Sequence, residues 1–208
     1  MLQYSTVEPA TLAILNDLMK ISELSNFYLV GGTNLSLRYG HRISIDIDLF
    51  SVVDFEPSLI SELLEKNFPQ KDNTFRATSI GVFANINNVK VDLIRNHYHP
   101  LIYEPELIDG IRFYDERDIA AMKIFAILRR GAKKDFYDVF ELLKKFSLKE
   151  IIGFYEKKYP AQKLFITIPQ TLTYFDDANE SEDPVSLTNT SWEEVKLALQ
   201  KVVNDFLR

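Results

Sequence analysis

The chain has 208 residues, of which 46% are hydrophobic and 26% are charged, and these are the proportions of an ordinary globular protein. The absence of cysteine excludes disulfides, thiolate zinc sites and a cysteine nucleophile, and a formal net charge of −6 argues against non-specific nucleic-acid binding over the whole surface. No apolar run could span a bilayer and no signal pattern opens the chain, so we expect a cytoplasmic protein without a membrane partner.

The first half of the chain predicts helices that alternate with short strands. Gly40 is expected to end the second helix in the left-handed conformation, and Asn87-Asn88 is expected to form a hairpin turn between the last two strands. In chain order, the predicted elements are a helix from Pro9, a strand at Phe27–Val30, a helix at Thr33–Tyr39, a strand at Ile43–Phe50, a helix at Glu56–Phe68, and strands at Thr74–Ile86 and Val89–Arg95.

From about residue 118 the periodicity predicts helices only. Asp118 is the expected N-cap of the first of them, which Gly131 ends, and Ser191 begins a capping box for the last. These helices are expected at Ile119–Arg130, Lys134–Phe146, Leu148–Lys158, Gln162–Phe175 and from Ser191 through Leu207, with an exposed acidic loop at 176–190. The order of elements predicts an α+β fold, in which a small mixed β-sheet flanked by helices is followed by a C-terminal helical half.

A diglycine turn followed by paired acids is the pattern that points to chemistry. Gly31 and Gly32 end an apolar strand, and the amides that follow can meet a phosphate. Asp46 and Asp48 occupy alternate positions of the next predicted strand, so both carboxylates face the same way. Such neighbours repel each other unless a cation lies between them, and oxygen ligands suit Mg²⁺ or Mn²⁺. The pattern predicts a metal site for phosphate chemistry; the alternative is a pair of solvated acids.

Other polar residues could complete this site. Asp92 shares a strand face with Lys90, and it could supply a third metal ligand and help to activate an attacking hydroxyl, unless it is merely solvated. Thr33 could bind a triphosphate tail or simply cap the helix that it begins. Arg42 and Ser44 are candidates for nucleotide contact, and the alternative is a position at the rim without function.

Lys123 carries the ammonium group of an otherwise apolar helical stretch. We expect it to reach an anionic partner, either the site carboxylates or a triphosphate, and the alternative is that it extends to water. Asp135 and Asp138 are three residues apart and therefore share one helix face, although acids near a helix start are also favoured by its dipole. A basic cluster that could contact RNA phosphates is formed by Arg129, Arg130, Lys133 and Lys134. The pair His97-x-His99 could chelate zinc but has no third ligand at motif spacing.

The residues of these motifs and their spacing resemble those of a known superfamily. Gly31-Gly32-Thr33 followed by His41-Arg42-x-Ser44-x-Asp46-Ile47-Asp48-Leu49-Phe50 resembles the signature of the DNA polymerase β-type nucleotidyltransferases, and it is similar to the AbiEii/AbiGii toxin family within it. Ala121-Met122-Lys123 and Lys134-Asp135-Phe136-x-Asp138 extend the resemblance. It implies a polymerase β-like nucleotidyltransferase core at residues 1–115 and a helical domain at residues 116–208 that completes the active-site cleft. It also favours active-site roles for Lys123 and Asp135.

The resemblance implies a function as well. The expected activity is that of an NTP-dependent nucleotidyltransferase, the toxin of a type IV toxin–antitoxin or abortive-infection system, with an RNA acceptor such as the tRNA 3′ end and a cognate antitoxin encoded nearby. One alternative is transfer to a small molecule such as an aminoglycoside, or to a protein hydroxyl, because the acidic net charge suits a cationic acceptor. The other is a catalytically silent interaction module, against which the complete set of acids and Lys123 counts.

Overall fold

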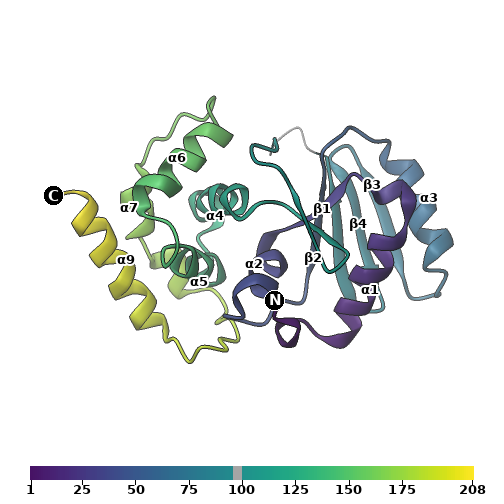
Figure 1. Cartoon of the computed structure of the whole chain (residues 1–208), viewed down its shortest axis with the longest axis horizontal. Coiled ribbons are helices and arrows are strands. Elements are labelled where there is room, and N and C mark those ends of the chain that lie inside the picture. The colour runs from purple at the N-terminus through teal and green to yellow at the C-terminus, as the bar shows by residue number, and fades with distance from the viewer. Residues whose placement is uncertain (96–99) are drawn as a thin grey trace.

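The computed structural model describes residues 1–95 and 100–208, and it has one mixed sheet of seven strands with helices on both faces (Figure 1). The strand order is β3-β4-β5-β2-β1-β7-β6. The strands are β1 (Phe27–Val30), β2 (Ile47–Ser51), β3 (Thr74–Thr78), β4 (Gly81–Ile86), β5 (Val89–Ile94), β6 (Glu106–Ile108) and β7 (Ile111–Phe113). The predicted α+β class with a small mixed sheet is confirmed.

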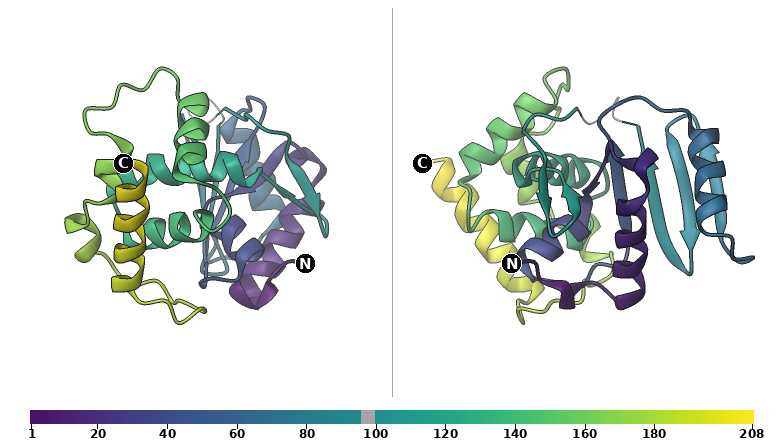
Figure 2. Two further views of the ribbon diagram at one scale, coloured as in Figure 1. Left: turned by 60° about the vertical axis from the view of Figure 1, so that its left-hand side comes forward. Right: turned by 45° about the vertical axis from the view of Figure 1, so that its right-hand side comes forward.

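Helices fill the rest of the chain. They are α1 (Pro9–Lys20), α2 (Gly31–Tyr39), α3 (Pro57–Asn67), α4 (Glu116–Arg130), α5 (Lys133–Leu142), α6 (Leu148–Lys158), α7 (Ile168–Leu172), α8 (Asp176–Asn179) and α9 (Trp192–Phe206), with short 3₁₀ turns at Tyr4–Thr6 and Ser22–Leu24. Figure 2 shows α6 and α9 gathered on the side of the molecule away from α1 and α3. Within the described part of the chain, no helix combines the length and the apolar character needed to cross a membrane.

The central strand β2 separates the molecule into two environments. It runs antiparallel to β1 and parallel to β5. Ile47 and Leu49 are fully buried in the core that α1 and α3 cover, whereas Phe50 packs on the opposite side with residues of α2 and α4. Because strand residues alternate between faces, Asp48 shares the second face with Phe50. The site acids therefore lie on the sheet face that the helical half covers.

The apolar core has two parts. One consists of buried side chains from Leu2 to Phe113, and the other contains Val30, Leu35 and buried side chains from Tyr114 to Val203. The strand β1 and the helix α2 contribute to both parts, so the two cores are joined through the segment that carries the diglycine turn. The expected boundary between two domains near residue 115 stays a prediction.

Several predicted elements have different limits in the structure. Helix α2 begins at Gly31 rather than at Thr33, and α5 ends at Leu142 rather than at Phe146. Strand β2 begins at Ile47 rather than at residue 43, because the backbone before it forms isolated bridges, Val7 with Ser44 and Arg42 with Ser186. The predicted strand 74–86 is a hairpin, β3 and β4. Helix α4 begins at Glu116, and its cap is Asp115, which accepts a hydrogen bond from the Arg117 amide at 2.8 Å.

The largest error of the sequence-based prediction is in the C-terminal region. The predicted helix 162–175 is wrong, since only Ile168–Leu172 is helical there, and the predicted loop 176–190 begins with the short helix α8. The hairpin β6–β7 has no counterpart among the predicted elements. The predicted bounds of α6, the Ser191 capping box of α9 and the turn at Asn87-Asn88, where both residues have positive φ, are confirmed.

Candidate active site

Asp48 and Asp92 lie side by side on neighbouring strands. They are direct register partners in the parallel pair β2–β5, and the backbone of Val30, next to Gly31, pairs with Asp48 on its other side. Burial raises the pKa of Asp48 to about 6, and the nearby negative charges of Asp92 and Asp46 act in the same direction. Two carboxylates at this spacing in a partly buried position form an acidic centre that favours a positive charge.

The Asp92 carboxylate is only partly satisfied. Its Oδ2 is 2.8 Å from Nζ of Lys90, a side chain that remains 58% exposed, while its Oδ1 is buried without a hydrogen-bond partner among the described residues. A buried carboxylate oxygen without a donor is costly, and it is a recognised sign of a missing partner. Asp46, which was predicted to pair with Asp48 on one strand, directly precedes β2 and is partly exposed, and its charge contributes to the raised pKa of Asp48.

The diglycine turn brings the start of α2 against the acids. Gly31 has φ +72°, and a Cβ at this position would lie 2.5 Å from Oδ2 of Asp48, so the close approach requires glycine. A Cβ on Gly32 would collide with the Arg42 guanidinium and lie 3.2 Å from Oγ of Ser44. The two glycines therefore permit the packing of α2 on the acidic segment, in addition to any contact with a phosphate.

Thr33 and Ser44 take part in that packing. The Thr33 hydroxyl donates a short hydrogen bond to the backbone carbonyl of Asp46, and Ser44 Oγ lies 2.9 Å from Thr33 Oγ1. Both residues are buried. These contacts anchor the backbone of Asp46 to the start of α2, and the predicted contact of Thr33 and Ser44 with a nucleotide stays a prediction.

Lys123 does reach anionic partners, and they are on α5. Its Nζ is 3.0 Å from Oδ1 of Asp135 and 2.5 Å from Oδ2 of Asp138, and only 5% of the residue is exposed. Arg130 also binds Asp135, with Nε 2.9 Å from Oδ2. As expected for residues three apart on a helix, the two acids act on one face. The Lys123 side chain still lines the cavity beside Asp48.

Asp138 is the centre of a buried charged cluster. Arg42 binds it through two nitrogens, Nε to Oδ1 at 2.8 Å and Nη2 to Oδ2 at 2.9 Å, and His41 Nε2 lies 2.7 Å from Oδ1. Burial alone would raise the pKa of Asp138. The charges of Arg42 and Lys123 nevertheless hold this pKa well below its ordinary value. The guanidinium of Arg42 is thus occupied by the protein itself. The sequence did not predict roles for His41 and Asp138 in this cluster, because their contact joins residues 97 apart.

A cavity of about 280 Å³ opens beside these acids. It lies between the sheet and α4 and is bordered by Asp48, Phe50, Met122, Phe125 and Arg129. Two aromatic rings and an arginine next to the Asp48 carboxylate suit an aromatic, anionic ligand such as a nucleotide. The contribution of Phe50 could have been suspected from its position two residues after Asp48 on the same strand face, whereas the spacing of two residues between Lys123 and Phe125 on a helix gives no such signal.

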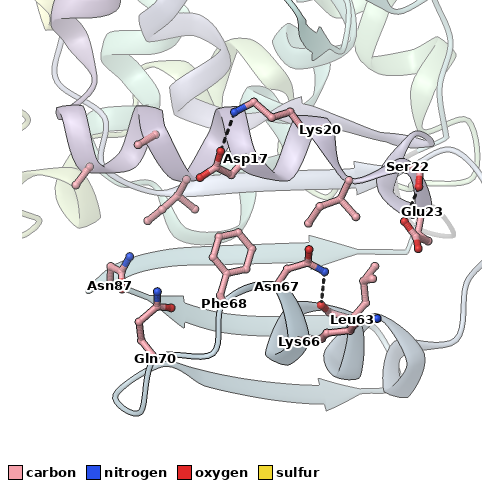
Figure 3. A pocket seen from close by; sticks show the side chains of 14 residues that line it. Asp17, Lys20, Ser22, Glu23, Leu63, Lys66, Asn67, Phe68, Gln70 and Asn87 are labelled. Atoms are coloured by element: carbon pink, nitrogen blue, oxygen red, sulfur yellow. Dashed lines mark hydrogen bonds and ion pairs between the residues drawn. The ribbon is translucent and has the colours of Figure 1, made fainter.

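A second, larger cavity has a different character. It measures about 700 Å³ and lies between α1 and α3, on the sheet face opposite to Asp48 (Figure 3). Its lining carries two acids, Asp17 and Glu23, and two cations, Lys20 and Lys66, so its charges are balanced. Nothing in this groove resembles a reaction centre, and the smaller cavity at Asp48 is therefore the candidate site.

The predicted metal site stays a prediction. Among residues 1–95 and 100–208, no group of three or more histidine, aspartate or glutamate side chains is arranged to hold a metal ion. The structure brings Asp48 and Asp92 together, and a site with three carboxylates stays a prediction. The histidines of the pair at 97 and 99 lie outside the described residues.

Comparison with known proteins identifies the family. A family model described as nucleotidyl transferase AbiEii toxin, type IV toxin–antitoxin system, matches residues 13–162. The chain belongs to the AbiEii family of nucleotidyltransferase toxins. This AbiEii-family chain is also 34% identical over 201 residues to an uncharacterized protein of Aquifex aeolicus, with 93% of this chain and 94% of that protein covered.

Solved structures show that the AbiEii-family chain has the polymerase β-like nucleotidyltransferase fold. A Helicobacter pylori protein assigned as a nucleotidyltransferase is 20% identical with a TM-score of 0.59, covering 95% of this chain and 94% of that one. The nucleotidyltransferase toxin MenT4 of Mycobacterium tuberculosis is 12% identical with a TM-score of 0.57, covering 94% and 82%. ANT(2″)-Ia, solved with adenylyl-2″-tobramycin, is 15% identical with a TM-score of 0.50, covering 71% and 95%.

Proposed function

We propose that this chain is the metal-dependent nucleotidyltransferase toxin of a type IV toxin–antitoxin system, and that it transfers nucleotides from an NTP to an RNA such as the 3′ end of tRNA. The observation that carries the proposal is the pairing of Asp48 with Asp92 beside the start of α2 at Gly31. Membership of the family supports an NTP as the substrate and a separately encoded antitoxin as the partner.

The acids have the properties of a divalent-cation site. Asp92 Oδ1 is buried and lacks a donor among the described residues, and the pKa of Asp48 is raised by burial and by its acidic neighbours. Both features indicate a local excess of negative charge. Mg²⁺ or Mn²⁺, which prefer oxygen ligands, would neutralise this charge by binding the carboxylate oxygens. Asp48 and Asp92 are the proposed ligands, with Asp46 as the third. Such an ion, when bound, stabilises charge on the reacting phosphates.

The proposed reaction is a direct displacement at the α-phosphorus of the NTP. The acceptor hydroxyl oxygen forms a bond to phosphorus while the bond to the bridging oxygen of pyrophosphate breaks, and the hydroxyl proton passes to a carboxylate. Asp92 is the proposed proton acceptor, because it has an oxygen without a hydrogen bond among the described residues. Backbone amides at the start of α2, next to Gly31 and Gly32, would bind the triphosphate.

The buried cations are proposed to act mainly by holding the site in place. Lys123 lines the cavity while its ammonium binds Asp135 and Asp138, so it joins the nucleotide cavity to α5. Arg42 fixes the segment before Asp46 through its two bonds to Asp138. In this proposal Lys123 contacts the triphosphate as well as the acids, whereas Asp135 positions Lys123.

A labelled-substrate assay tests the proposal. The protein is incubated with each of the four NTPs labelled at the α-phosphate, with total RNA and with Mg²⁺ or Mn²⁺, and the RNA is separated on a gel. We expect label in the tRNA band, and a loss of at least ~100-fold in Asp48→Asn and Asp92→Asn, as is typical when a charge-stabilising group is removed. Asp72→Asn, a change at an exposed residue on the far side of the sheet, serves as the matched control.

The same assay separates the alternatives. If an added aminoglycoside or a protein is labelled and RNA is not, the labelled molecule is the acceptor and the RNA acceptor is wrong. If no acceptor is labelled and Asp48→Asn inhibits growth as strongly as the unaltered chain, the protein is an interaction module. Calorimetric titration with Mg²⁺ and Mn²⁺ gives an independent measure of the proposed metal ligands, since binding should be lost in Asp48→Asn.

A further inference from the structure

A third cavity adjoins the candidate site along α4. It measures about 320 Å³ and is lined by Tyr155 and by the loop at 162–166. Phe125 and Arg129 line both this cavity and the one beside Asp48, so the two are adjoining parts of one surface. The α4 residues along it run from Met122 to Arg129, which corresponds to roughly 10 Å at the rise of an α-helix. A linear ligand could therefore extend from the acids to the loop.

Aromatic rings follow the same path. The ring of Phe125 stacks on that of Tyr159, with centroids 4.9 Å apart and an interplanar angle of 26°, and the Arg129 guanidinium lies 5.0 Å from the Phe125 ring centre. At the far end Phe165 is fully exposed. Rings combined with arginine are the means by which proteins bind unpaired bases, because every base has a face on which an aromatic side chain can stack.

The charge of this surface is opposite to that of the whole chain. Asp48 is the single acid among the described residues that line the two cavities, which also carry Arg129, Arg130 and Lys163. Arg130 is paired with Asp135, whereas Arg129 and Lys163 have no carboxylate partner within residues 1–95 and 100–208. A cationic acceptor such as an aminoglycoside would be repelled here, and a phosphate backbone would be attracted.

We propose that Phe125, Arg129, Lys163 and Phe165, which we call the α4 track, bind the unpaired end of a single-stranded RNA and direct its terminal hydroxyl toward Asp48 and Asp92. Arg129 and Lys163 contact the phosphates, and Phe165 stacks on a base. Phe125, whose ring packs on Tyr159 and beneath the Arg129 guanidinium, holds Arg129 in place. This inference rests on the proposed function, because it gives the RNA acceptor a binding surface. It also explains how a chain with a net charge of −6 can bind RNA locally.

Binding measurements test the α4 track without requiring catalysis. Fluorescence anisotropy gives the Kd of the full chain for a labelled single-stranded RNA and for a blunt duplex of the same sequence, at several salt concentrations. In the double variant Arg129→Gln/Lys163→Gln, the slope of log Kd against log salt should fall by roughly 1.4, about 0.7 for each lost phosphate contact. Phe165→Ala should raise Kd about 5- to 100-fold through the loss of one stacked base.

Control variants carry matched changes in α3 and in the turn that follows it. Lys71→Gln and Leu59→Ala remove an exposed cation and an exposed apolar side chain near α3, and they should leave Kd unchanged. Because Arg129, Lys163 and Phe165 are themselves exposed, the track variants should keep the melting temperature of the unaltered chain. In the labelled-NTP assay Lys163→Gln and Phe165→Ala, which change residues outside the cavity beside Asp48, should raise KM for RNA and leave KM for the NTP unchanged.

The outcomes distinguish this inference from the proposed function. If RNA is labelled but the track variants change neither Kd nor KM for RNA, the α4 track is wrong and the nucleotidyltransferase proposal stands. If RNA binds through the track but no NTP yields labelled RNA, the binding surface stands and the proposed reaction fails. Equal affinity for the single strand and the duplex, or no RNA binding by the unaltered chain, overturns the track.

Discussion

The substitution Asp48→Asn should stabilise the fold while it abolishes nucleotide transfer. In the folded chain the pKa of Asp48 is raised from 3.8 to about 6, first by burial and then by the charge of Asp92. The folded state therefore binds the proton more tightly than the unfolded chain does, and the ionised form costs stability. Asparagine has nearly the same shape and no charge, so it removes this cost.

The magnitude follows from the pKa. A rise of about two units at about 1.4 kcal/mol each gives roughly 3 kcal/mol, an upper limit because the side chain keeps some solvent contact. The whole cost applies above pH 6, and it disappears as the pH falls through the interval from about 6 to 3.8. At pH 7.5 the variant should melt roughly 6–12 °C above the unaltered chain, and near pH 4 the two should melt together.

Thermal melts followed by circular dichroism between pH 4 and pH 8 measure the difference directly. Asp72→Asn, which changes an exposed acid, should show no pH-dependent gain. A melting temperature for Asp48→Asn that equals or falls below that of the unaltered chain at pH 7.5 would refute the reasoning. So would a gain of equal size at pH 4, because it could not come from the carboxylate charge.

The other predictions concern the same site and its supports. Asp138→Asn should cost about 3–5 kcal/mol in urea unfolding, since it leaves buried cations without their carboxylate, and a cost below 1 kcal/mol would contradict this. Gly31→Ala should abolish transfer and lower the melting temperature, because its Cβ would lie 2.5 Å from Oδ2 of Asp48. The control Gly153→Ala, in α6 with nothing near its Cβ, should instead stabilise by about 0.5–1 kcal/mol. Saturating Mg²⁺ should raise the melting temperature of the unaltered chain but not that of Asp48→Asn; an equal rise in both would remove Asp48 from the metal site.

The positions of the two central acids were predictable because they depend on local patterns. Alternation in β2 and β5, together with the asparagine turn before β5, places Asp48 and Asp92 on one sheet face. The start of β2 was not predictable, since residues 42–44 form bridges with Val7 and Ser186, which are distant in the sequence. The expected ladder there is replaced by single contacts with two different segments.

Of the other prediction errors, one could have been avoided from local sequence signals and one could not. The Thr167 capping box and the proline at 169 mark the start of α7, so the overlong helix at 162–175 could have been avoided. Asp118 was assigned as a helix cap, but its carboxylate binds Lys158 and the amides of Ile102 and Tyr103. A buried ion pair between residues 40 apart leaves no signal in the sequence of either segment. The partners of Lys123 were expected in kind, an anion, but not in identity.

The Asp138 cluster has a consequence for how the molecule unfolds. His41 and Arg42 belong to the segment that leads into β2, Lys123 belongs to α4, and all three meet one carboxylate on α5. Separating the sheet from the helical half would break all three contacts at once. We therefore expect both halves to melt in a single cooperative transition. We also expect that a fragment ending near residue 115, which lacks Lys123 and Asp138, does not hold Asp48 and Asp92 in place.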